Sequence, residues 1–320
     1  MAHSDARTDD VGPPVHAGPP AFGRARFPLS RWGLIAVFLG PTILLFVGLT
    51  IYPVARTVYN SFFTIRPRGQ NVFVGWQNYV SAAGDAVFYR SVVNTLQWAV
   101  LVPLVEVALG LVLALFIYAR IPFARFFRIA WFTPVLVSYV VVAIMWGWLF
   151  NSDWGLINAM LRAVGLSGWQ QAWLSDPNLA LGSLMFVDVW KWTGFNMIIC
   201  LAALHGLPSE VMEAAELDNC GWLQKLYFIV IPMIAPTLVG VFVLGFIGKM
   251  KVFDLVWIMT GGGPLWSTET VSTYVFKRAF NWSTFDLGYP SAIATAWFLV
   301  IFVSVVLVMV VLRRREKLEY

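Results

Sequence analysis

The chain has 320 residues, of which 59 % are hydrophobic and only 12 % are charged, and its formal net charge is +5. A soluble domain carries about 25 % charged residues, so this composition excludes an ordinary soluble enzyme and indicates a protein embedded mostly in a membrane. The positive balance does not indicate nucleic-acid binding, because no basic patch with interleaved aromatic residues forms a groove signature.

The N-terminal segment 1–28 contains Pro13-Pro14, Pro19-Pro20 and scattered Gly and Ala, without apolar periodicity. Such a composition is typical of a disordered segment. A cleaved signal is not expected, because the apolar run that follows is too long for one. We predict a disordered cytoplasmic tail over 1–28 and a short C-terminal tail over 316–320.

Six apolar blocks between the tails are long enough to cross a bilayer, which requires about 20 residues each. They cover residues 32–54, 91–119, 126–150, 179–205, 232–258 and 290–312. The fifth block is the least uniform, since Lys249, Lys251 and Asp254 lie near its end. The sequence therefore predicts an all-α integral membrane domain over 29–315, with six transmembrane helices.

The basic residues in the connecting segments indicate the orientation. With the N-terminus inside the cell, twelve Lys and Arg residues fall on the cytoplasmic side and seven on the outer side. Lys191, Lys249 and Lys251 lie within or at the ends of spans and belong to neither side. Both termini and the charged segment 207–232 are accordingly predicted to be cytoplasmic.

Cys200 and Cys220 are the only cysteines of the chain. Both are predicted on the cytoplasmic side of the membrane, where a disulfide is not expected to form. Neither these residues nor the three histidines show metal-ligand spacing. We therefore expect no metal site in this chain.

The segment 207–232 is charged and amphipathic, unlike the short turns that usually link spanning helices. Ser209 can cap a helix with acidic residues in its first turn. Asn219 and Gly221 then supply turn chemistry, because both tolerate positive φ. A second helix is expected to run until Pro232 interrupts it. Two such helices could form a binding element for a soluble partner. The alternative is a loop that lies on the membrane surface.

Six positions of this segment form a recognisable pattern: Glu213, Ala214, Ala215, Asp218, Ile229 and Pro232. In order and spacing the pattern resembles the EAA loop of bacterial ABC importer permeases. Four further stretches also resemble the sugar-type permeases of binding-protein-dependent systems, the group that includes the maltose and glycerol-phosphate importers: 73–80, 189–197, 253–270 and 286–293. The resemblance covers roughly residues 30 to 315.

This resemblance implies a type I ABC importer permease fold in the bacterial cytoplasmic (inner) membrane. It implies three partners: a cytoplasmic ABC ATPase dimer, a second, homologous permease subunit, and an extracytoplasmic solute-binding protein that delivers a sugar or related polyol. The ATPase would contact the loop at Glu213, Ala214, Ala215, Asp218, Asn219 and Gly221. ATP and Mg would be bound by that partner, since this chain carries no nucleotide-binding motif and no cofactor is expected in it.

One position departs from the family pattern, because Asn219 stands where the family usually has Gly. Asn is the non-Gly residue that best tolerates left-handed backbone geometry. We therefore expect the turn to be preserved.

Three ionisable residues, Glu106, Asp188 and Lys191, lie within predicted spans, where a charge costs at least about 2.5 kcal/mol at the membrane centre. Asp188 and Lys191 are three residues apart on one helical face, so they are expected to neutralise each other. Their role is either a buried pair that fixes helix packing or a polar wall of the translocation path. The sequence leaves open whether Glu106 faces a partner subunit or this path.

The end of the fifth block combines polar and aromatic residues, as a sugar site requires: Lys251, Phe253, Asp254 and Trp257. Sugar hydroxyls bind charged or amide groups, and the C–H face of a sugar stacks on aromatic rings. The resemblance also places this stretch on the outer half of the path. The alternative is an interfacial belt with snorkelling lysines.

Two other functions are alternatives to an ATP-driven importer. An ion-coupled secondary transporter would use Asp188, Lys191 or Glu106 for coupling. An integral-membrane enzyme is not supported, because no His, Asp and Glu cluster recurs at helical spacing on the cytoplasmic side. The sequence specifies neither the sugar nor the companion permease.

Overall fold

The computed structural model describes residues 31–65, 71–119, 121–281 and 286–316. The chain divides between Pro53 and Val54 into two compact units. The predicted tail 1–28 lies outside the described residues, as does the C-terminal tail beyond Glu316. The first unit contains helix α1 (Arg31–Phe46), which continues into the π-helical turn η1 (Val47–Ile51).

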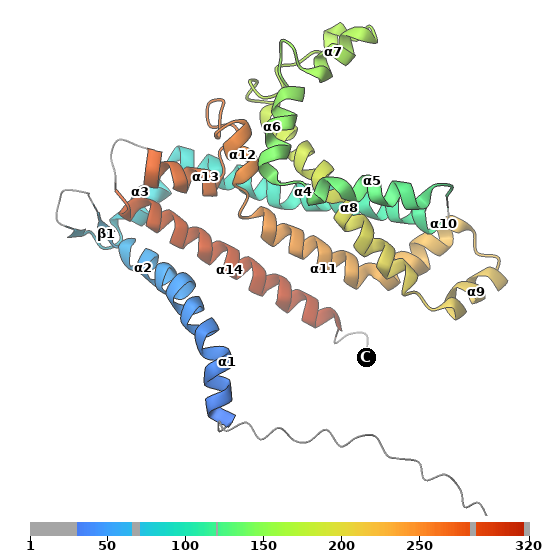
Figure 1. Ribbon diagram of the computed structural model, residues 1–320, viewed down its shortest axis with the longest axis horizontal. Coiled ribbons are helices and arrows are strands. Elements are labelled where there is room, and N and C mark those ends of the chain that lie inside the picture. Colours follow the sequence, from blue (N-terminus) through green and yellow to red (C-terminus); the bar gives the residue numbers. More distant parts are fainter. Residues whose placement is uncertain (1–30, 66–70, 120, 282–285, 317–320) are drawn as a thin grey trace, which may run out of the picture. The chain divides into compact units, whose positions relative to one another are not determined.

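The second unit is almost entirely helical where the structure describes it (Figure 1). Helix α2 (Tyr52–Asn60) begins at the boundary between the units, and the strands β1 (Phe63–Thr64) and β2 (Val72–Phe73) form a short antiparallel pair in which Phe63 is opposite Phe73. The remaining elements are α3 (Gln77–Ala83), α4 (Ala86–Tyr118), α5 (Ala124–Leu136), α6 (Tyr139–Leu149), α7 (Leu156–Ala163), η2 (Ser167–Trp169), α8 (Ala180–His205), α9 (Ser209–Leu217), α10 (Trp222–Lys225), η3 (Leu226–Val230), α11 (Ile231–Lys249), α12 (Asp254–Met259), α13 (Val271–Phe276), η4 (Lys277–Asn281) and α14 (Gly288–Glu316).

Five helical segments of the described chain are long and apolar enough to cross a membrane. They are Ile35–Asn60, Ala86–Tyr118, Ala180–His205, Trp222–Lys249 and Gly288–Val310. A sixth is formed if the pair α5 and α6, which is bent by 102°, counts as one span. The prediction of an all-α integral membrane protein is thus confirmed, and the block 126–150 proves to be a broken helix rather than a continuous one.

The fifth span begins and ends earlier than the apolar block 232–258 indicated. It starts at Trp222, because the helix continues through η3 into α11, and it ends at Lys249. The expectation that Pro232 interrupts the helix is therefore wrong. Proline lacks an N–H and crowds the preceding turn, and the wider π-helical turn just before it accommodates both effects within one helix.

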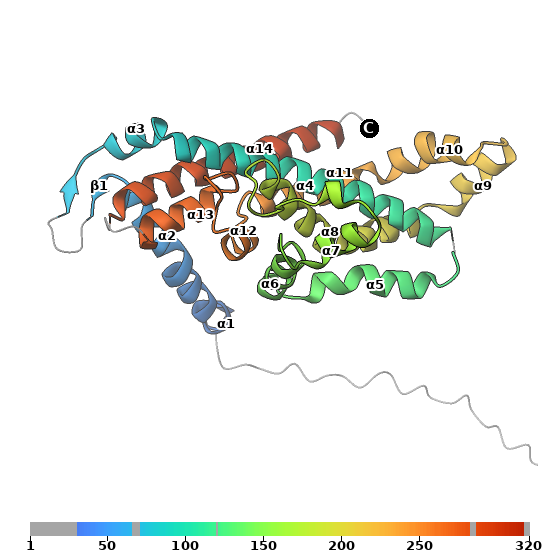
Figure 2. The ribbon, with the colours of Figure 1, turned by 90° about the horizontal axis from the view of Figure 1, so that it is seen from above.

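Helix α4 packs against α8, and α11 and α5 add to this pair (Figures 1 and 2). Glycines permit the close approach of these helices, as is usual where lipid supplies no driving force for association. A Cβ on Gly194 of α8 would lie 1.9 Å from the carbonyl oxygen of Trp131 in α5. A Cβ on Gly245 of α11 would lie 2.9 Å from Pro103 of α4. Backbone therefore meets backbone between α5 and α8.

The replacement Gly194→Ala is expected to destabilise the protein by at least about 2 kcal/mol, because a methyl group cannot occupy that space without moving α5. The control is Gly182→Ala on the same helix, where a Cβ meets nothing within 4 Å. Thermal unfolding in detergent should show a lower midpoint for Gly194→Ala and little change for Gly182→Ala. Equal midpoints for the two variants would contradict the close contact.

Asp85 joins three elements at the N-terminal end of α4. Its side chain accepts hydrogen bonds from the backbone N–H groups of Val87 (2.9 Å) and Phe88 (3.2 Å), and so caps α4. The hydroxyl groups of Tyr274 in α13 and Tyr289 in α14 also donate to it. Burial raises the pKa of Asp85, but these four hydrogen bonds outweigh it and hold the pKa below its usual value.

The lowered pKa of Asp85 predicts a pH-dependent contribution to stability. The contribution is present above the unfolded-state pKa of about 3.9 and is lost as the pH falls through the folded-state value. Asp85→Asn should therefore lower the free energy of unfolding by about 1 kcal/mol at pH 7, since it removes charge-assisted hydrogen bonds. The difference between wild type and variant should shrink as unfolding is measured at pH values approaching 3. A difference that stays constant over this range would show that the charge is not involved.

Candidate functional site

The break between α5 and α6 is the local feature from which the site is built. Pro134 lies in the last turn of α5, and Ser138 begins α6 by accepting a hydrogen bond from the N–H of Val141 (3.4 Å). Backbone carbonyls at such a helix end lack intrahelical donors. Lys191 of α8 supplies the missing donors. Its Nζ donates to the carbonyl oxygens of Pro134 (3.0 Å), Val135 (3.2 Å) and Val137 (2.5 Å). A buried ammonium group thus caps the C-terminus of α5.

The expected pairing of Asp188 with Lys191 is wrong. Among the residues that the structure describes, Asp188 forms its ion pair with Lys249 of α11. Residues three apart on a helix point in directions that differ by about 60°, because each residue advances the helix by about 100°. Lys191 turns toward the broken segment, where carbonyl oxygens lack donors, whereas Asp188 turns toward α4 and α11.

Lys249 connects three helices. Its Nζ lies 2.8 Å from Oδ2 of Asp188 on α8 and 3.0 Å from Oε1 of Glu106 on α4. All three side chains are buried, with relative exposures of 7 % or less. We call Glu106, Asp188 and Lys249 the charged triad. Because one ammonium serves two carboxylates, removal of Lys249 would leave two buried charges without their cation.

Indole and phenol groups complete the partners of Asp188. Trp98 Nε1 donates to Oδ2 (2.7 Å), and the hydroxyl of Tyr139, the first residue of α6, donates to Oδ1 (3.0 Å). The same hydroxyl accepts a hydrogen bond from Nε1 of Trp192 (2.5 Å). The start of α6 is therefore tied to the charged triad through Tyr139.

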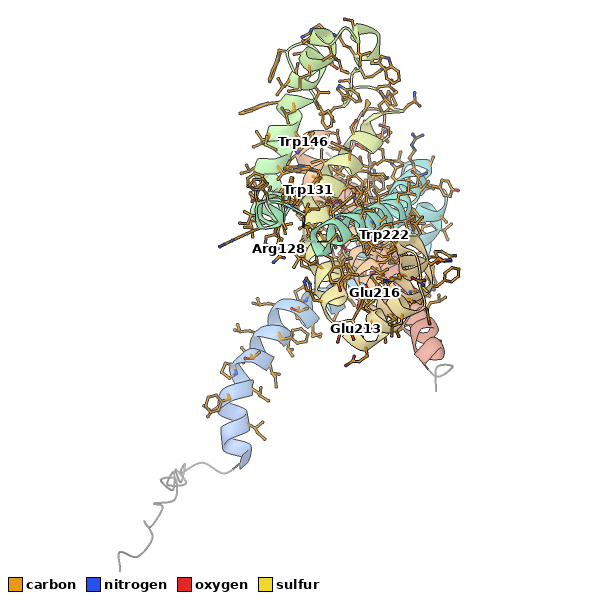
Figure 3. All side chains as sticks on the ribbon, turned by 90° about the vertical axis from the view of Figure 1, so that its right-hand side faces the viewer. Arg128, Trp131, Trp146, Glu213, Glu216 and Trp222 are labelled. Carbon is orange, nitrogen blue, oxygen red and sulfur yellow. The ribbon has the colours of Figure 1, made fainter. Side chains whose placement is uncertain are left out.

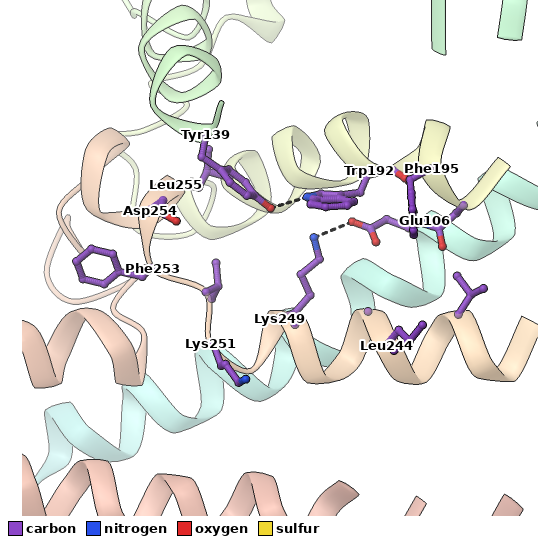
Figure 4. A pocket seen from close by; sticks show the side chains of 15 residues that line it. Glu106, Tyr139, Trp192, Phe195, Leu244, Lys249, Lys251, Phe253, Asp254 and Leu255 are labelled. Carbon is purple, nitrogen blue, oxygen red and sulfur yellow. Dashed lines mark hydrogen bonds and ion pairs between the residues drawn. The ribbon is translucent and has the colours of Figure 1, made fainter. Parts of the chain in front are cut away.

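A cavity of about 380 Å³ opens beside the charged triad (Figure 4). Its lining combines Glu106 and Lys249 with aromatic rings and an amide, and draws on α4, α6, α8, α11 and the segment up to Leu255. The lining residues are Glu106, Tyr139, Trp192, Phe195, Asn196, Val241, Leu244, Gly245, Gly248, Lys249, Lys251, Val252, Phe253, Asp254 and Leu255. Its volume lies within the range of small-molecule sites.

The six residues predicted for the path fall into three groups. Lys251, Phe253 and Asp254 line the cavity, whereas Asp188 and Lys191 lie behind it and hold its wall together. Trp257 is not part of the lining; it stacks on Phe253 with ring centroids 5.7 Å apart. The expectation that these residues lie at the end of the fifth span is also wrong, because that span ends at Lys249.

Four aromatic or amide residues of the lining were not among the predicted path residues: Tyr139, Trp192, Phe195 and Asn196. The last three lie in the stretch 189–197, which resembles the family; the sequence makes the fourth span, with Trp190 and Trp192, only the second candidate for the path. Glu106 had been noted without an orientation. The partner of Glu106 could have been found by counting charges in the predicted spans. Two buried acids require a cation, and Lys249 lies in the fifth block.

The segment 207–232 contains the predicted helix–turn–helix. Asn219 has φ of 53° and closes α9 with two hydrogen bonds, from Asn219 N to Glu216 O (3.1 Å) and from Cys220 N to Ala215 O (3.0 Å). This is the Schellman arrangement, and it confirms the left-handed geometry expected of Asn219. Gly221 differs from expectation, since its φ is −62° and it precedes α10 in an extended conformation.

The surface of this segment mixes charged and apolar side chains (Figure 3). Glu213 is exposed, and Leu217 and Trp222 are 85 % and 65 % exposed. An ion pair of 3.1 Å joins Glu216 to Lys225 across the turn, a contact worth at most about 1 kcal/mol at such exposure. Ser209 does not cap α9, because Pro208 precedes the helix and Ser209 is its first residue.

The triad predicts which pairs of charges are energetically coupled. In a double-mutant cycle of Asp188→Asn with Lys249→Met, the coupling energy should be about 1–3 kcal/mol, as is usual for contacting groups. The matched cycle of Asp188→Asn with Lys191→Met should give a smaller coupling energy, because Asp188 and Lys191 form no ion pair. Unfolding titrations in mixed micelles measure both. A larger coupling to Lys191 would restore the pairing read from the sequence.

Comparisons with known proteins agree with this architecture. Residues 106–318 match the family described as "binding-protein-dependent transport system inner membrane component". The probable ABC transporter permease protein YurN of Bacillus subtilis (strain 168) is 33 % identical over 264 residues, which are 81 % of this chain and 89 % of YurN. The sulfoquinovosyl glycerol transport system permease protein SmoG of Agrobacterium fabrum is 31 % identical over 83 % of this chain and 85 % of SmoG.

A solved structure shares the fold. The crystal structure of a bacterial ABC transporter involved in the import of the acidic polysaccharide alginate contains a chain that superposes with a TM-score of 0.75. The superposition covers 88 % of this chain and 95 % of that chain, at 23 % sequence identity. Together with the matched family and the two relatives, it leads to one conclusion: this chain belongs to the inner membrane components of binding-protein-dependent transport systems, and is a permease subunit of an ABC importer.

Proposed function

We propose that this permease translocates a sugar or a related polyol compound, delivered by an extracytoplasmic binding protein, in an importer driven by a separate ATPase. The cavity beside the charged triad is the observation that carries this proposal. Glu106, Lys249 and Asn196 offer hydrogen-bonding groups to hydroxyls, and Trp192, Phe195 and Phe253 offer ring faces. This combination suits a polyhydroxylated ligand, whose C–H faces stack while its hydroxyl groups are bound by polar side chains.

The name of another relative supports a saccharide substrate: LacF of Rhizobium radiobacter, 31 % identical over 84 % of this chain, is named a lactose transport system permease protein. We extend only the substrate class to this chain. The particular sugar depends on the binding protein as well as on the cavity.

The segment 207–232 is the proposed contact with the ATPase. Its exposed Leu217 and Trp222, next to Glu213, form a surface that is both apolar and acidic, as a docking element requires. The residues proposed to couple are Glu213, Ala214, Ala215, Asp218, Asn219 and Gly221. In the proposed arrangement, the segment and both termini lie on the cytoplasmic side of a bacterial inner membrane, and the partner binds ATP and Mg.

The proposed assembly contains an ATPase dimer, this permease, a second, homologous permease and the binding protein. Closure of the ATPases would move the segment 207–232 as a rigid element and switch the spans between outward-open and inward-open states. Alternating access of this kind requires the helices that line the cavity to change partners. During such a change, the ion pairs of the triad would either stay intact while the helices move together or break.

Uptake assays test the energy source. Proteoliposomes with the complete assembly should accumulate a labelled saccharide only with ATP inside and binding protein outside, and vanadate should abolish the uptake while a protonophore leaves it unchanged. The opposite sensitivity would favour the ion-coupled secondary transporter. Absence of uptake for every saccharide offered would overturn the proposed substrate class.

Coupling through Glu213 has its own test. Glu213→Lys should leave insertion and assembly intact but reduce transport-stimulated ATP hydrolysis at least about tenfold, because a basic group would meet the partner's surface where an acidic one belongs. Glu210→Lys, an exposed change of the same charge on the same helix, is the control. Normal stimulation in Glu213→Lys would exclude the role, and equal losses in both variants would indicate a general effect of charge.

A further inference from the structure

Lys191 and Lys249, two of the three lysines at or behind the cavity lining, are already committed to protein partners. Lys191 uses its three donors on the carbonyl oxygens of the α5–α6 break. Lys249 lies between the carboxylates of Glu106 and Asp188, and its Nζ is 5.4 Å from the centre of the Trp192 ring. With both acids ionised, the formal charge of the triad is −1. An anion that entered this part of the cavity would therefore find no cation free of a carboxylate.

The carboxylate of Glu106, in contrast, retains acceptor capacity. Its Oε1 is buried and contacts Nζ of Lys249 at 3.0 Å. Asn196, the neighbouring amide, donates its own N–H to the carbonyl oxygen of Trp192 (3.0 Å). A carboxylate has about four lone-pair positions, so Glu106 can accept further hydrogen bonds from a ligand.

The charged residues at the other end of the lining do not alter this balance. Lys251 and Asp254 are both exposed and of opposite charge. Figure 4 shows the Lys251 side chain turned away from the group formed by Glu106, Lys249, Tyr139 and Trp192. The deep part of the cavity is thus bounded by an acceptor carboxylate and aromatic rings, with its lysine shared between two acids.

We propose that the cavity selects uncharged polyhydroxyl ligands over their anionic counterparts, and that Glu106 is the specificity-determining residue. Hydroxyl groups donate to its free lone pairs, whereas a carboxylate or sulfonate on the ligand meets a triad of net negative charge. This inference rests on the proposed function and narrows its substrate class. Selection of this kind operates in the permease and is separate from selection by the binding protein.

Direct binding to the permease tests the inference without the binding protein. The assembled transporter in nanodiscs is dialysed against labelled ligands in matched pairs that differ by one charge: methyl glucoside and methyl glucuronide, glucosylglycerol and glucosylglycerate, lactose and lactobionate. The neutral member of a pair should bind at least about tenfold more tightly than the acid, a difference that corresponds to about 1.4 kcal/mol. Equal binding of both members would overturn the inference.

Two variants assign the selection to the cavity. Glu106→Gln keeps the shape and an acceptor oxygen but removes the charge, so the preference should fall below about threefold. Leu244→Lys adds a cation to the lining at an exposed position and should also raise binding of the acid, which provides a test if Glu106→Gln fails to assemble. Asp153→Asn, an exposed carboxylate outside the lining, is the matched control and should keep the wild-type preference.

The outcomes separate this inference from the proposed function. If the complete assembly takes up a saccharide but the nanodisc complex binds neither member of any pair, the cavity is not the selecting site and the inference fails alone. If Glu106→Gln and Leu244→Lys both retain the tenfold preference, the assignment to Glu106 fails. If no saccharide is taken up even with binding protein and ATP, the proposed function itself fails.

Discussion

The ion pairs of Lys249 with Glu106 and Asp188 are the constraint on which the described site depends. Each of the three side chains comes from a different helix, and each would be costly to bury alone. Together they fix the register of α4, α8 and α11, since a shift of any one helix by a residue would separate the ammonium from a carboxylate. Tyr139 extends the same network to α6.

Much of the fold followed from composition, because lipid imposes long apolar segments and helical hydrogen bonding on any chain that crosses it. The turn at Asn219 could also be predicted, since few non-Gly residues accept left-handed geometry. The break at Val137 could not, although Pro134 precedes it. A proline inside an apolar block is compatible with a kink as well as with a 102° bend, and only the donors of Lys191, 54 or more residues away, decide between them.

The partners of charged residues were the least predictable part of the site. Asp188 and Lys191 are near in sequence, and proximity along a helix suggested a pair. In the structure Asp188 instead pairs with Lys249, 61 positions later in the sequence. A buried carboxylate is costly unless it is paired, so a cation that is close in space stabilises it even when it is distant in sequence. In the segment 207–232 the turn at Asn219 was predicted correctly, because it depends on neighbouring residues, whereas the cap at Ser209 and the break at Pro232 were not.

The continuous helix Trp222–Lys249 has a consequence for how force travels through the molecule. Its 28 residues span about 42 Å at 1.5 Å per residue, and its two ends are the turn after Asn219 and the ammonium of the triad. If the ATPase moves the segment 207–232 as proposed, a rotation of α10 about the helix axis would also move Lys249 relative to Glu106 and Asp188. The π-helical turn η3 lies near the α10 end of this helix. In the proposed mechanism, this helix would therefore link the contact with the ATPase directly to the ion pairs beside the cavity.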